Sequence, residues 1–291
     1  MKRYAILLAA VSVHLCLGGI YAWSVFVTPL REAFGYSAAQ TQFVFGTYFL
    51  VQTILMIFTG PLLDRYGPRP LAVASGVLFA TGNLVVAFAG STFAALWLGY
   101  GVLGGLSVGC GYVGPIAAGV RWFPEHRGAI CGVGVAGYGA GAIVLAGLAK
   151  ALFARAVPVL HVFRFVGLLY GAVIVLAGLC LSMPPGARVE RAAFPRRRLI
   201  GDRRFWQLCV GISCGTVPGL AIIGSLKPIG QSLGAGLPEA IAAQAIGFYA
   251  VGNATGRVLW GLVVDRLGGR ATVRLSLACV AASALVVAVS G

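Results

Sequence analysis

Residues 60–69 read GPLLDRYGPR, and residues 261–270 read GLVVDRLGGR. Both copies have glycine, then the pair aspartate-arginine, then glycine and arginine at the same relative positions, and each lies between two long apolar runs. The match continues upstream through three further pairs of positions at the same spacing: Gly46 and Gly247, Tyr48 and Tyr249, and Gln52 and Asn253. An internal repeat that joins apolar runs is typical of secondary transporters built from duplicated helical bundles.

The repeated loops carry polar residues that a simple turn between two apolar helices does not need. We expect these residues to act as a gate: Gly60, Asp64, Arg65 and Arg69 in the first copy, and Gly261, Asp265, Arg266 and Arg270 in the second. An aspartate close to the N-terminus of a neighbouring helix stabilises that packing through the helix dipole. The alternative is a plain topology signal. That signal needs only the arginines, so the repeated aspartate and glycine favour a gating latch.

The composition identifies the class of protein. Hydrophobic residues make up 59% of the 291 residues and charged residues 10%, against roughly 45–50% and about 25% in soluble domains. Backbone groups in lipid must be satisfied internally, so apolar runs long enough to cross the bilayer form helices. We therefore predict an all-α polytopic membrane protein. The expected spanning segments are about residues 4–27, 41–63, 70–90, 92–118, 128–153, 162–183, 205–226, 240–264 and 272–290.

The formal net charge of +15 is placed asymmetrically along the chain. If the N-terminus is cytoplasmic, the inner loops hold most of the basic residues, including the run Arg196–Arg198. The outer loops then hold only Arg31, Lys150, Arg155, Arg164 and Lys227. This bias is the positive-inside signal, and the arginine run is interpreted as a topology and anionic-lipid anchor. We expect a multi-pass protein of the plasma (inner) membrane with a cytoplasmic N-terminus, in contact with the lipid bilayer and not with nucleic acid.

The chain is expected to divide at its longest polar stretch, which is rich in arginine. In this interpretation residues 1–184 form an N-terminal six-helix bundle, residues 185–204 a basic cytoplasmic linker, and residues 205–291 an incomplete C-terminal bundle of three helices. At the spacing of the repeat, the last residue corresponds to residue 90, at the end of the third predicted segment. About nine of twelve helices are therefore expected, which predicts either a fragment of a twelve-helix protein or a truncated gene.

Arg257 lies in the middle of the predicted segment 240–264, where a charged side chain is costly and usually functional. Asn253 and Tyr249 precede it by one and two helical turns on the same face. A guanidinium is always charged and presents a fork that fits a carboxylate, so one interpretation is that Arg257 binds a substrate anion. The other is a structural partner, such as a helix carbonyl or a buried acid. The acids all lie in expected loops or at helix ends: Glu32, Asp64, Glu125, Glu190, Asp202, Glu239 and Asp265.

Other side chains within the predicted helices have two interpretations each. Four aromatic residues either line a cavity or serve as packing: Tyr21, Trp23, Tyr112 and Tyr138. His14 is either a hydrogen-bonded helix contact or a proton relay. The glycine-rich stretch of residues 99–114 and that of residues 132–141 favour close helix packing, as a static contact or as a rocking interface. No catalytic residue, metal-binding cluster or phosphate-binding loop is predicted.

The repeated G-x-x-x-D-R-x-G-x-R loop resembles the signature of the major facilitator superfamily. Within it, four further motifs resemble the oxalate/formate antiporter family: GIYAWS at residues 19–24, RWFPEHRG at 121–128, GYG at 137–139 and NATGR at 253–257. The resemblance implies a major-facilitator-type helical bundle in which Arg257 binds a substrate carboxylate. The helix packing that it implies would let Asp265 meet the segment that begins near Arg127 and would leave Asp64 without a partner in this chain. It also implies that Tyr21, Tyr112 and Tyr138 line the pocket, and Asn253 and Tyr249 join the expected site because they share the Arg257 face.

Two departures from this family affect the expected substrate. The family's oxalate transporter has a glutamine where Ile20 stands here. Its second cationic residue, a lysine on the eleventh helix, would lie beyond the last residue of this chain. The chain therefore carries one anion-binding charge, which fits a monocarboxylate better than a dicarboxylate.

These observations predict a secondary active transporter that moves a small carboxylate, such as oxalate, formate, lactate or pyruvate, by alternating access. It is expected to be a monomer when complete, to need no cofactor and not to be an enzyme. The alternative is a non-transporting truncated remnant or partner subunit of a transporter. Exchange, proton coupling and uniport are all consistent with these residues.

Overall fold

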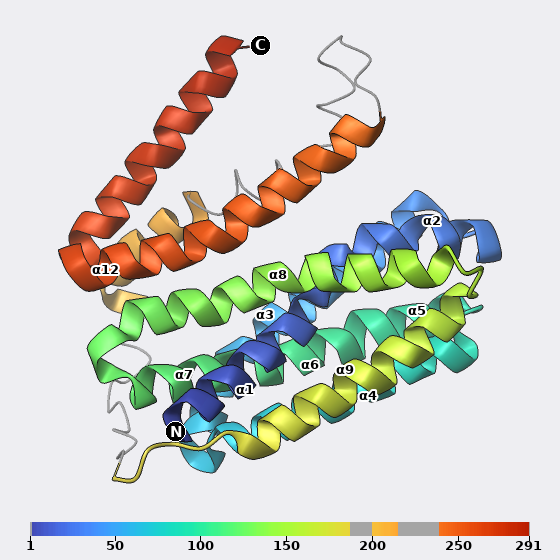
Figure 1. The fold of residues 1–291 in the computed structure, drawn as a ribbon, viewed down its shortest axis with the longest axis horizontal. Helices are drawn as coiled ribbons and strands as arrows, with labels where there is room; N and C mark the ends of the chain where they lie inside the picture. The colour runs from blue at the N-terminus through green and yellow to red at the C-terminus, as the bar shows by residue number, and fades with distance from the viewer. Residues whose placement is uncertain (1, 187–199, 215–238, 291) are drawn as a thin grey trace.

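A computed structural model describes residues 2–186, 200–214 and 239–290, and within these ranges every regular element is a helix (Figure 1). The helices of the first half are α1 (Lys2–Leu17), η1 (Gly18–Ala22), α2 (Trp23–Phe34), α3 (Ala38–Tyr66), α4 (Pro68–Ala89), α5 (Phe93–Leu96), η2 (Trp97–Leu103), α6 (Gly104–Gly111), α7 (Val113–Trp122), η3 (Pro124–His126), α8 (Arg127–Phe153) and α9 (Val159–Cys180). Residues 203–214 are also helical, and the last element is α12 (Glu239–Ser290). The predicted all-α fold is confirmed.

By length and composition, 7 helical spans in the described residues are able to cross a membrane. The first of them match the first six predicted segments: Lys2–Phe34, Ala38–Tyr66, Pro68–Ala89, Phe93–Trp122, Pro124–Phe153 and Val159–Cys180. The last, Val251–Val286, lies within α12, which contains both predicted segments 240–264 and 272–290. The predicted segment 205–226 is helical through residue 214, and its remainder lies outside the described residues. The multi-pass architecture expected from the composition is therefore present.

The two copies of the repeat fold into the same turn. Gly67 separates α3 from α4 with φ 78° and ψ 178°, and Gly268 breaks α12 with φ 75° and ψ 162°. This backbone conformation is open essentially only to glycine, because a Cβ atom would clash with the main chain. The repeated glycine is thus explained by the turn that it makes. Each turn follows its aspartate, Asp64 or Asp265, by three residues.

Helices α1 to α9 pack around an aromatic core. In this core Trp23 stacks on Tyr100 with ring centroids 4.5 Å apart, and Phe26 lies 5.0 Å from Phe163. The extensive helix pairs include α4 with α9 and α1 with α8. Helices α1, η1 and α2 form one continuous span. Within it, Val11 and Gly18 contact Gly137 and Tyr138 in the middle of α8.

Gly268 divides α12 into a first arm, residues 239–267, and a second arm, residues 269–290. Helix α12 meets the rest of the protein along the first arm. Figure 1 shows this arm beside α8, whereas the arm that follows Gly268 extends away from α1–α9. The second arm and the helical residues 203–214 line a groove of about 570 Å³. Apolar side chains such as Leu285 and Val286 are exposed on this arm. The division into two bundles joined by residues 185–204 stays a prediction, because most of that linker lies outside the described residues.

The turn at Gly67 generates a prediction about stability. Gly67→Ala should destabilise the solubilised protein by about 1–3 kcal/mol, because alanine is strained in this conformation. Gly46→Ala is the matched control in the preceding helix, where an added Cβ meets nothing within 4 Å; there alanine should be neutral or stabilising. Thermal unfolding of the two variants measures the difference, and equal melting temperatures would contradict this explanation of the repeated glycine.

Candidate functional site

Arg257 lies on the first arm of α12, half-buried against α8. Its Nε donates to Oδ1 of Asn253, one helical turn earlier, at 2.7 Å. A guanidinium nitrogen, Nη1, also donates to the main-chain carbonyl of Val135 on α8 at 3.4 Å. The structural partner that the sequence left open is therefore a helix carbonyl. Within the described residues Arg257 forms no ion pair, since the one ion pair found there joins Arg3 to Glu125.

Arg257 has more hydrogen-bond donors than its protein acceptors use. Gly139 of α8 lies beside it, where an added Cβ would be 3.5 Å from Oδ1 of Asn253 and 3.9 Å from Nε of Arg257. A guanidinium has five N–H donors, and the hydrogen bonds to Asn253 and Val135 employ only part of them. The same guanidinium interacts electrostatically with the Tyr112 phenol. A carboxylate entering here would meet a cation, an amide and a hydroxyl.

The structure brings the three predicted tyrosines together in one cluster. Tyr138 lies at the centre, with ring centroids 5.4 Å from Tyr21 and 5.2 Å from Tyr112, both in edge-on contact. Tyr21 and Tyr112 are half-buried, whereas Tyr138 is 2% exposed and its hydroxyl forms no hydrogen bond within the described residues. A buried hydroxyl without a partner is unfavourable unless something else, such as a ligand or water, satisfies it. Both predicted functions of these tyrosines, packing and cavity lining, are compatible with this arrangement.

Other predicted site residues are placed less completely. Asn253 lies directly beside Arg257, as the helical spacing predicted. Tyr249 belongs to α12, but its side chain lies outside the described part of the structure. Ile20, which stands where the family's oxalate transporter has glutamine, is 2% exposed and packs inside the bundle beside Tyr48 and Tyr100.

Asp265 contacts the start of α8, the segment expected to receive it, and its function as a gating latch stays a prediction. Its Oδ1 accepts from the backbone N–H of Gly128 at 2.7 Å, and its Oδ2 accepts from that of Ala129 at 2.8 Å. These are orphan donors of the first helical turn, so the carboxylate caps α8 and lies at the positive end of its dipole. We identify this contact between Asp265, Gly128 and Ala129 as the α8 cap.

Glycine permits the close approach that the α8 cap requires. A Cβ at Gly128 would lie 2.4 Å from the carbonyl oxygen of Gly261, and a Cβ at Gly261 would lie 2.4 Å from that of Gly128. Further along α8, a Cβ at Gly132 would lie 2.5 Å from the Arg257 carbonyl oxygen. One glycine-lined contact therefore runs between α8 and α12 from the cap to the Arg257 turn.

The first copy of the repeat is arranged differently. Asp64 is exposed and has no hydrogen bond or ion pair in the described residues, and nothing lies within 4 Å of a Cβ added at Gly60. Arg65 lies over the ring of Tyr66 at 5.1 Å, and Nε of Arg69 donates to the Leu181 carbonyl at 3.3 Å. Arg266 and Arg270 are exposed at the corresponding positions of the second copy. In the described part of the chain, the aspartate of the second loop bonds to the start of another helix, as expected of a latch, and the aspartate of the first loop does not.

Sequence reasoning missed an ion pair at the same end of the molecule as the α8 cap. Nη1 of Arg3, at the start of α1, donates to Oε1 of Glu125 at 3.1 Å, and its guanidinium lies 5.0 Å from the Phe123 ring. Glu125 is in η3, immediately before α8. The signal available in the sequence was that both residues fall in predicted cytoplasmic segments, but nothing in the pattern paired them.

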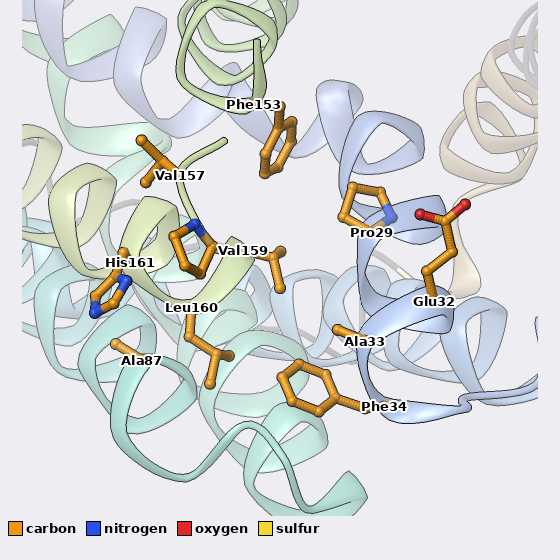
Figure 2. Close-up of a pocket in the computed structure, with 11 residues that line it drawn as sticks. Pro29, Glu32, Ala33, Phe34, Ala87, Phe153, Val157, Val159, Leu160 and His161 are labelled. Atoms are coloured by element: carbon orange, nitrogen blue, oxygen red, sulfur yellow. The ribbon is translucent and has the colours of Figure 1, made fainter. Parts of the chain in front are cut away.

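A separate cavity lies away from these residues. It has a volume of about 530 Å³ and is lined by the end of α2, by Ala87 of α4 and by residues 153 and 157–161 around the start of α9. Figure 2 shows Glu32 and His161 at opposite sides of its largely apolar lining. None of the predicted site residues lines it, so the candidate site remains the surroundings of Arg257 and the tyrosine cluster.

Comparison with known proteins identifies the group to which these features belong. Residues 7–291 match the sequence profile of the Major Facilitator Superfamily. The chain is 28% identical to the uncharacterized MFS-type transporter YhjX of Escherichia coli over 271 residues, which is 91% of this chain and 67% of that protein. It is 27% identical to the oxalate:formate antiporter of Oxalobacter formigenes over 274 residues, 92% of this chain and 64% of that protein. It is also 27% identical to monocarboxylate transporter 13 of Rattus norvegicus over 134 residues, 46% of this chain and 31% of that protein.

The α8 cap generates a prediction for which the first copy of the repeat supplies the control variant. Asp265→Asn should loosen the contact between α8 and α12, because the neutral amide offers one acceptor in place of two charged oxygens. Asp64→Asn, the matched change in the first copy, should have no such effect. The measurement is the rate at which a water-soluble maleimide modifies Cys131, which lies one turn after Gly128 and is partly exposed.

We expect several-fold faster modification of Cys131 in the Asp265 variant and an unchanged rate in the Asp64 variant. Exposed Cys180, resolved separately by mass spectrometry, is the internal reference. Equal acceleration by both substitutions would show that the α8 cap has no special part in closing this end of the protein.

Proposed function

Because this chain belongs to the Major Facilitator Superfamily of multi-pass membrane transporters, we propose that it is a secondary transporter of a small carboxylate. The observation that carries the proposal is Arg257, a permanent cation at the α8–α12 contact whose described partners are an amide oxygen, a main-chain carbonyl and the Tyr112 phenol. None of these partners neutralises its charge. An anion that enters the site supplies the charge that the described residues do not.

The charge and polarity of the site favour a small monocarboxylate. One guanidinium fits one carboxylate as a bidentate pair, and the described residues offer no second cation beside it. The edge-on rings of Tyr21, Tyr112 and Tyr138 form the adjoining wall, and their hydroxyls are able to donate to the carboxylate oxygens. Two of the relatives are named for carboxylates, oxalate and formate in one case and monocarboxylates in the other. Formate, lactate and pyruvate therefore fit better than oxalate.

The position of the α8 cap supports transport by alternating access. In the observed arrangement, Asp265 and the paired glycines Gly128 and Gly261 hold α8 against α12 at the loop end. Release of this contact would separate the two helices and open a route to Arg257 from that side. Asp64, Arg65 and Arg69 would serve the corresponding loop of the first half, and Arg266 and Arg270 would add basic charge beside the cap.

The placement of charge supports an orientation in the membrane. Lys2, Arg3 and the two repeated loops would face the cytoplasm, which puts the α8 cap at the cytoplasmic end of the transporter. In this orientation the end that the α8 cap closes is the cytoplasmic one. The proposed membrane is the plasma (inner) membrane.

Arg257→Ala tests the function directly. We expect binding of radiolabelled pyruvate to the solubilised protein to weaken by about 10–100-fold, as the loss of a charge-assisted pair predicts. Arg257→Lys should retain part of the affinity, because it keeps the charge and loses the fork. Binding is preferred to uptake as the readout because it does not require a complete transport cycle.

Arg274→Ala is the matched control, since it removes an exposed arginine from the second arm of α12, away from the site. It should bind pyruvate as the parent protein does. If Arg257→Ala binds pyruvate normally, or if formate, lactate and pyruvate all fail to bind the parent protein, the proposed function is wrong.

A further inference from the structure

His14 has an arrangement that the proposed binding site does not use. The side chain lies on α1, is 0% exposed, and belongs to the part of this helix that contacts α8. Its Nδ1 lies 2.9 Å from the carbonyl oxygen of Ala10, one turn earlier, and its Nε2 lies 3.1 Å from the carbonyl oxygen of Tyr112. Both ring nitrogens therefore face acceptors, and neither faces a donor among the described residues.

A neutral imidazole cannot satisfy two acceptors. It has one N–H donor and one nitrogen lone pair, so one of these carbonyl oxygens would face a lone pair. An imidazolium donates from both nitrogens and forms both hydrogen bonds. The surroundings of His14 are thus able to hold either form of the ring, and they offer an acceptor to each nitrogen when it is protonated, through two main-chain carbonyls that no substitution of a neighbouring side chain removes.

The groups around His14 connect it to Arg257. Its ring lies edge-on to Tyr112 at 5.2 Å and to Tyr138 at 6.4 Å, and Tyr112 interacts with the Arg257 guanidinium. On α9, which also packs against α1, Tyr170 interacts with Cys16 of α1. Among the described residues no acid and no other base contacts the His14 ring. Among the described residues, Arg257 is therefore the charged side chain that a single neighbour, Tyr112, connects to the His14 ring.

We infer that His14 takes up a proton when a carboxylate binds at Arg257, so that the protein carries the anion and a proton together. This inference rests on the proposed carboxylate site. With the site empty, an imidazolium at His14 and the guanidinium of Arg257 are two like charges separated by one tyrosine, which disfavours protonation. A carboxylate on Arg257 removes that repulsion, so anion binding and protonation promote each other by the same factor.

The charge balance of this step is complete. The proton comes from water on the side from which the anion enters. It binds the unprotonated ring nitrogen of His14 and returns to water on the other side. One carboxylate and one proton add up to zero net charge, so the loaded protein moves no charge across the membrane. In this chain, His14 is suited to the task because every aspartate and glutamate lies in a loop or near a helix end in the sequence pattern.

The test is the pH dependence of pyruvate binding to the solubilised full chain, between about pH 5 and about pH 8, where histidine changes charge. Pyruvate itself stays ionised throughout this range. We expect affinity to fall with rising pH, by up to about tenfold per pH unit where one proton is linked to one anion. Titration in a weakly buffered solution should also show uptake of about one proton per pyruvate bound.

His14→Gln should bind pyruvate without this pH dependence and without proton uptake, because glutamine is able to donate to the Tyr112 carbonyl but does not titrate. His161→Gln removes an exposed histidine elsewhere and should behave as the parent protein does. If His14→Gln fails to fold, nitrogen NMR of the parent protein labelled at histidine replaces it. The His14 ring should then change from imidazole to imidazolium when pyruvate is added near neutral pH.

The outcomes separate this inference from the proposed function. Pyruvate binding that depends on Arg257 but is independent of pH, with no proton uptake, would overturn the role of His14 and leave the carboxylate site standing. A His14 variant that keeps the full pH dependence would overturn it as well. Absence of pyruvate binding at every pH would contradict both, since the protonation step needs the bound anion.

Discussion

The contact between α8 and α12 places a permanent positive charge inside a helix long and apolar enough to cross a membrane, and the candidate site is organised around that charge. Arg257 receives a hydrogen-bond acceptor from its own helix, through Asn253, and another from α8, through the Val135 carbonyl. Such neutral acceptors reduce the cost of burying a guanidinium but leave its charge in place. The described residues supply no carboxylate to complete the pair. In the proposed transporter, the substrate completes it.

Packing links this charge to the end of the molecule where the helices are held together. The glycines at positions 128, 132 and 261 let main chain contact main chain, so at these positions no flexible side chain lies between the two helices to absorb a movement. Asp265 precedes Gly268 by one turn of helix and follows Arg257 by about two turns. A motion that releases the α8 cap must therefore also shift Arg257 relative to Tyr138. That mechanical link is what alternating access requires of this interface.

Several features of the fold and of the candidate site were predictable, because single residues or short-range spacing decide them. The repeated glycines at positions 67 and 268 predict turns because only glycine adopts that conformation easily, and the arginine inside an apolar run predicts a buried charge. Helical spacing also predicted that Asn253 would lie beside Arg257. The helix dipole predicted that Asp265 would favour a helix N-terminus, and the family resemblance indicated the one near Arg127; the structure places its partners at the next residues, Gly128 and Ala129.

Other features could not be read from the sequence, because main-chain groups and tertiary neighbours decide them. The carbonyls of Val135, Ala10 and Tyr112 carry no sequence signal, yet they define the surroundings of Arg257 and His14. The two repeated loops have nearly the same residues, but within the described residues Asp265 caps a helix and Asp64 does not, since α8 is placed against the second loop. Pattern therefore predicted which side chains carry charge, and folding determined which of them have partners.

A carboxylate lying against the Arg257 guanidinium is the contact on which the proposed transport depends. Solid-state NMR of the protein in lipid bilayers measures this contact directly, with the carboxylate carbon of formate labelled and arginine labelled at its guanidinium nitrogens. We predict dipolar coupling to one arginine at about 3–4 Å, the spacing of a bidentate pair, and its disappearance in Arg257→Lys. Coupling that persists in that variant, or formate that binds without contacting any guanidinium, would contradict a carboxylate site at Arg257.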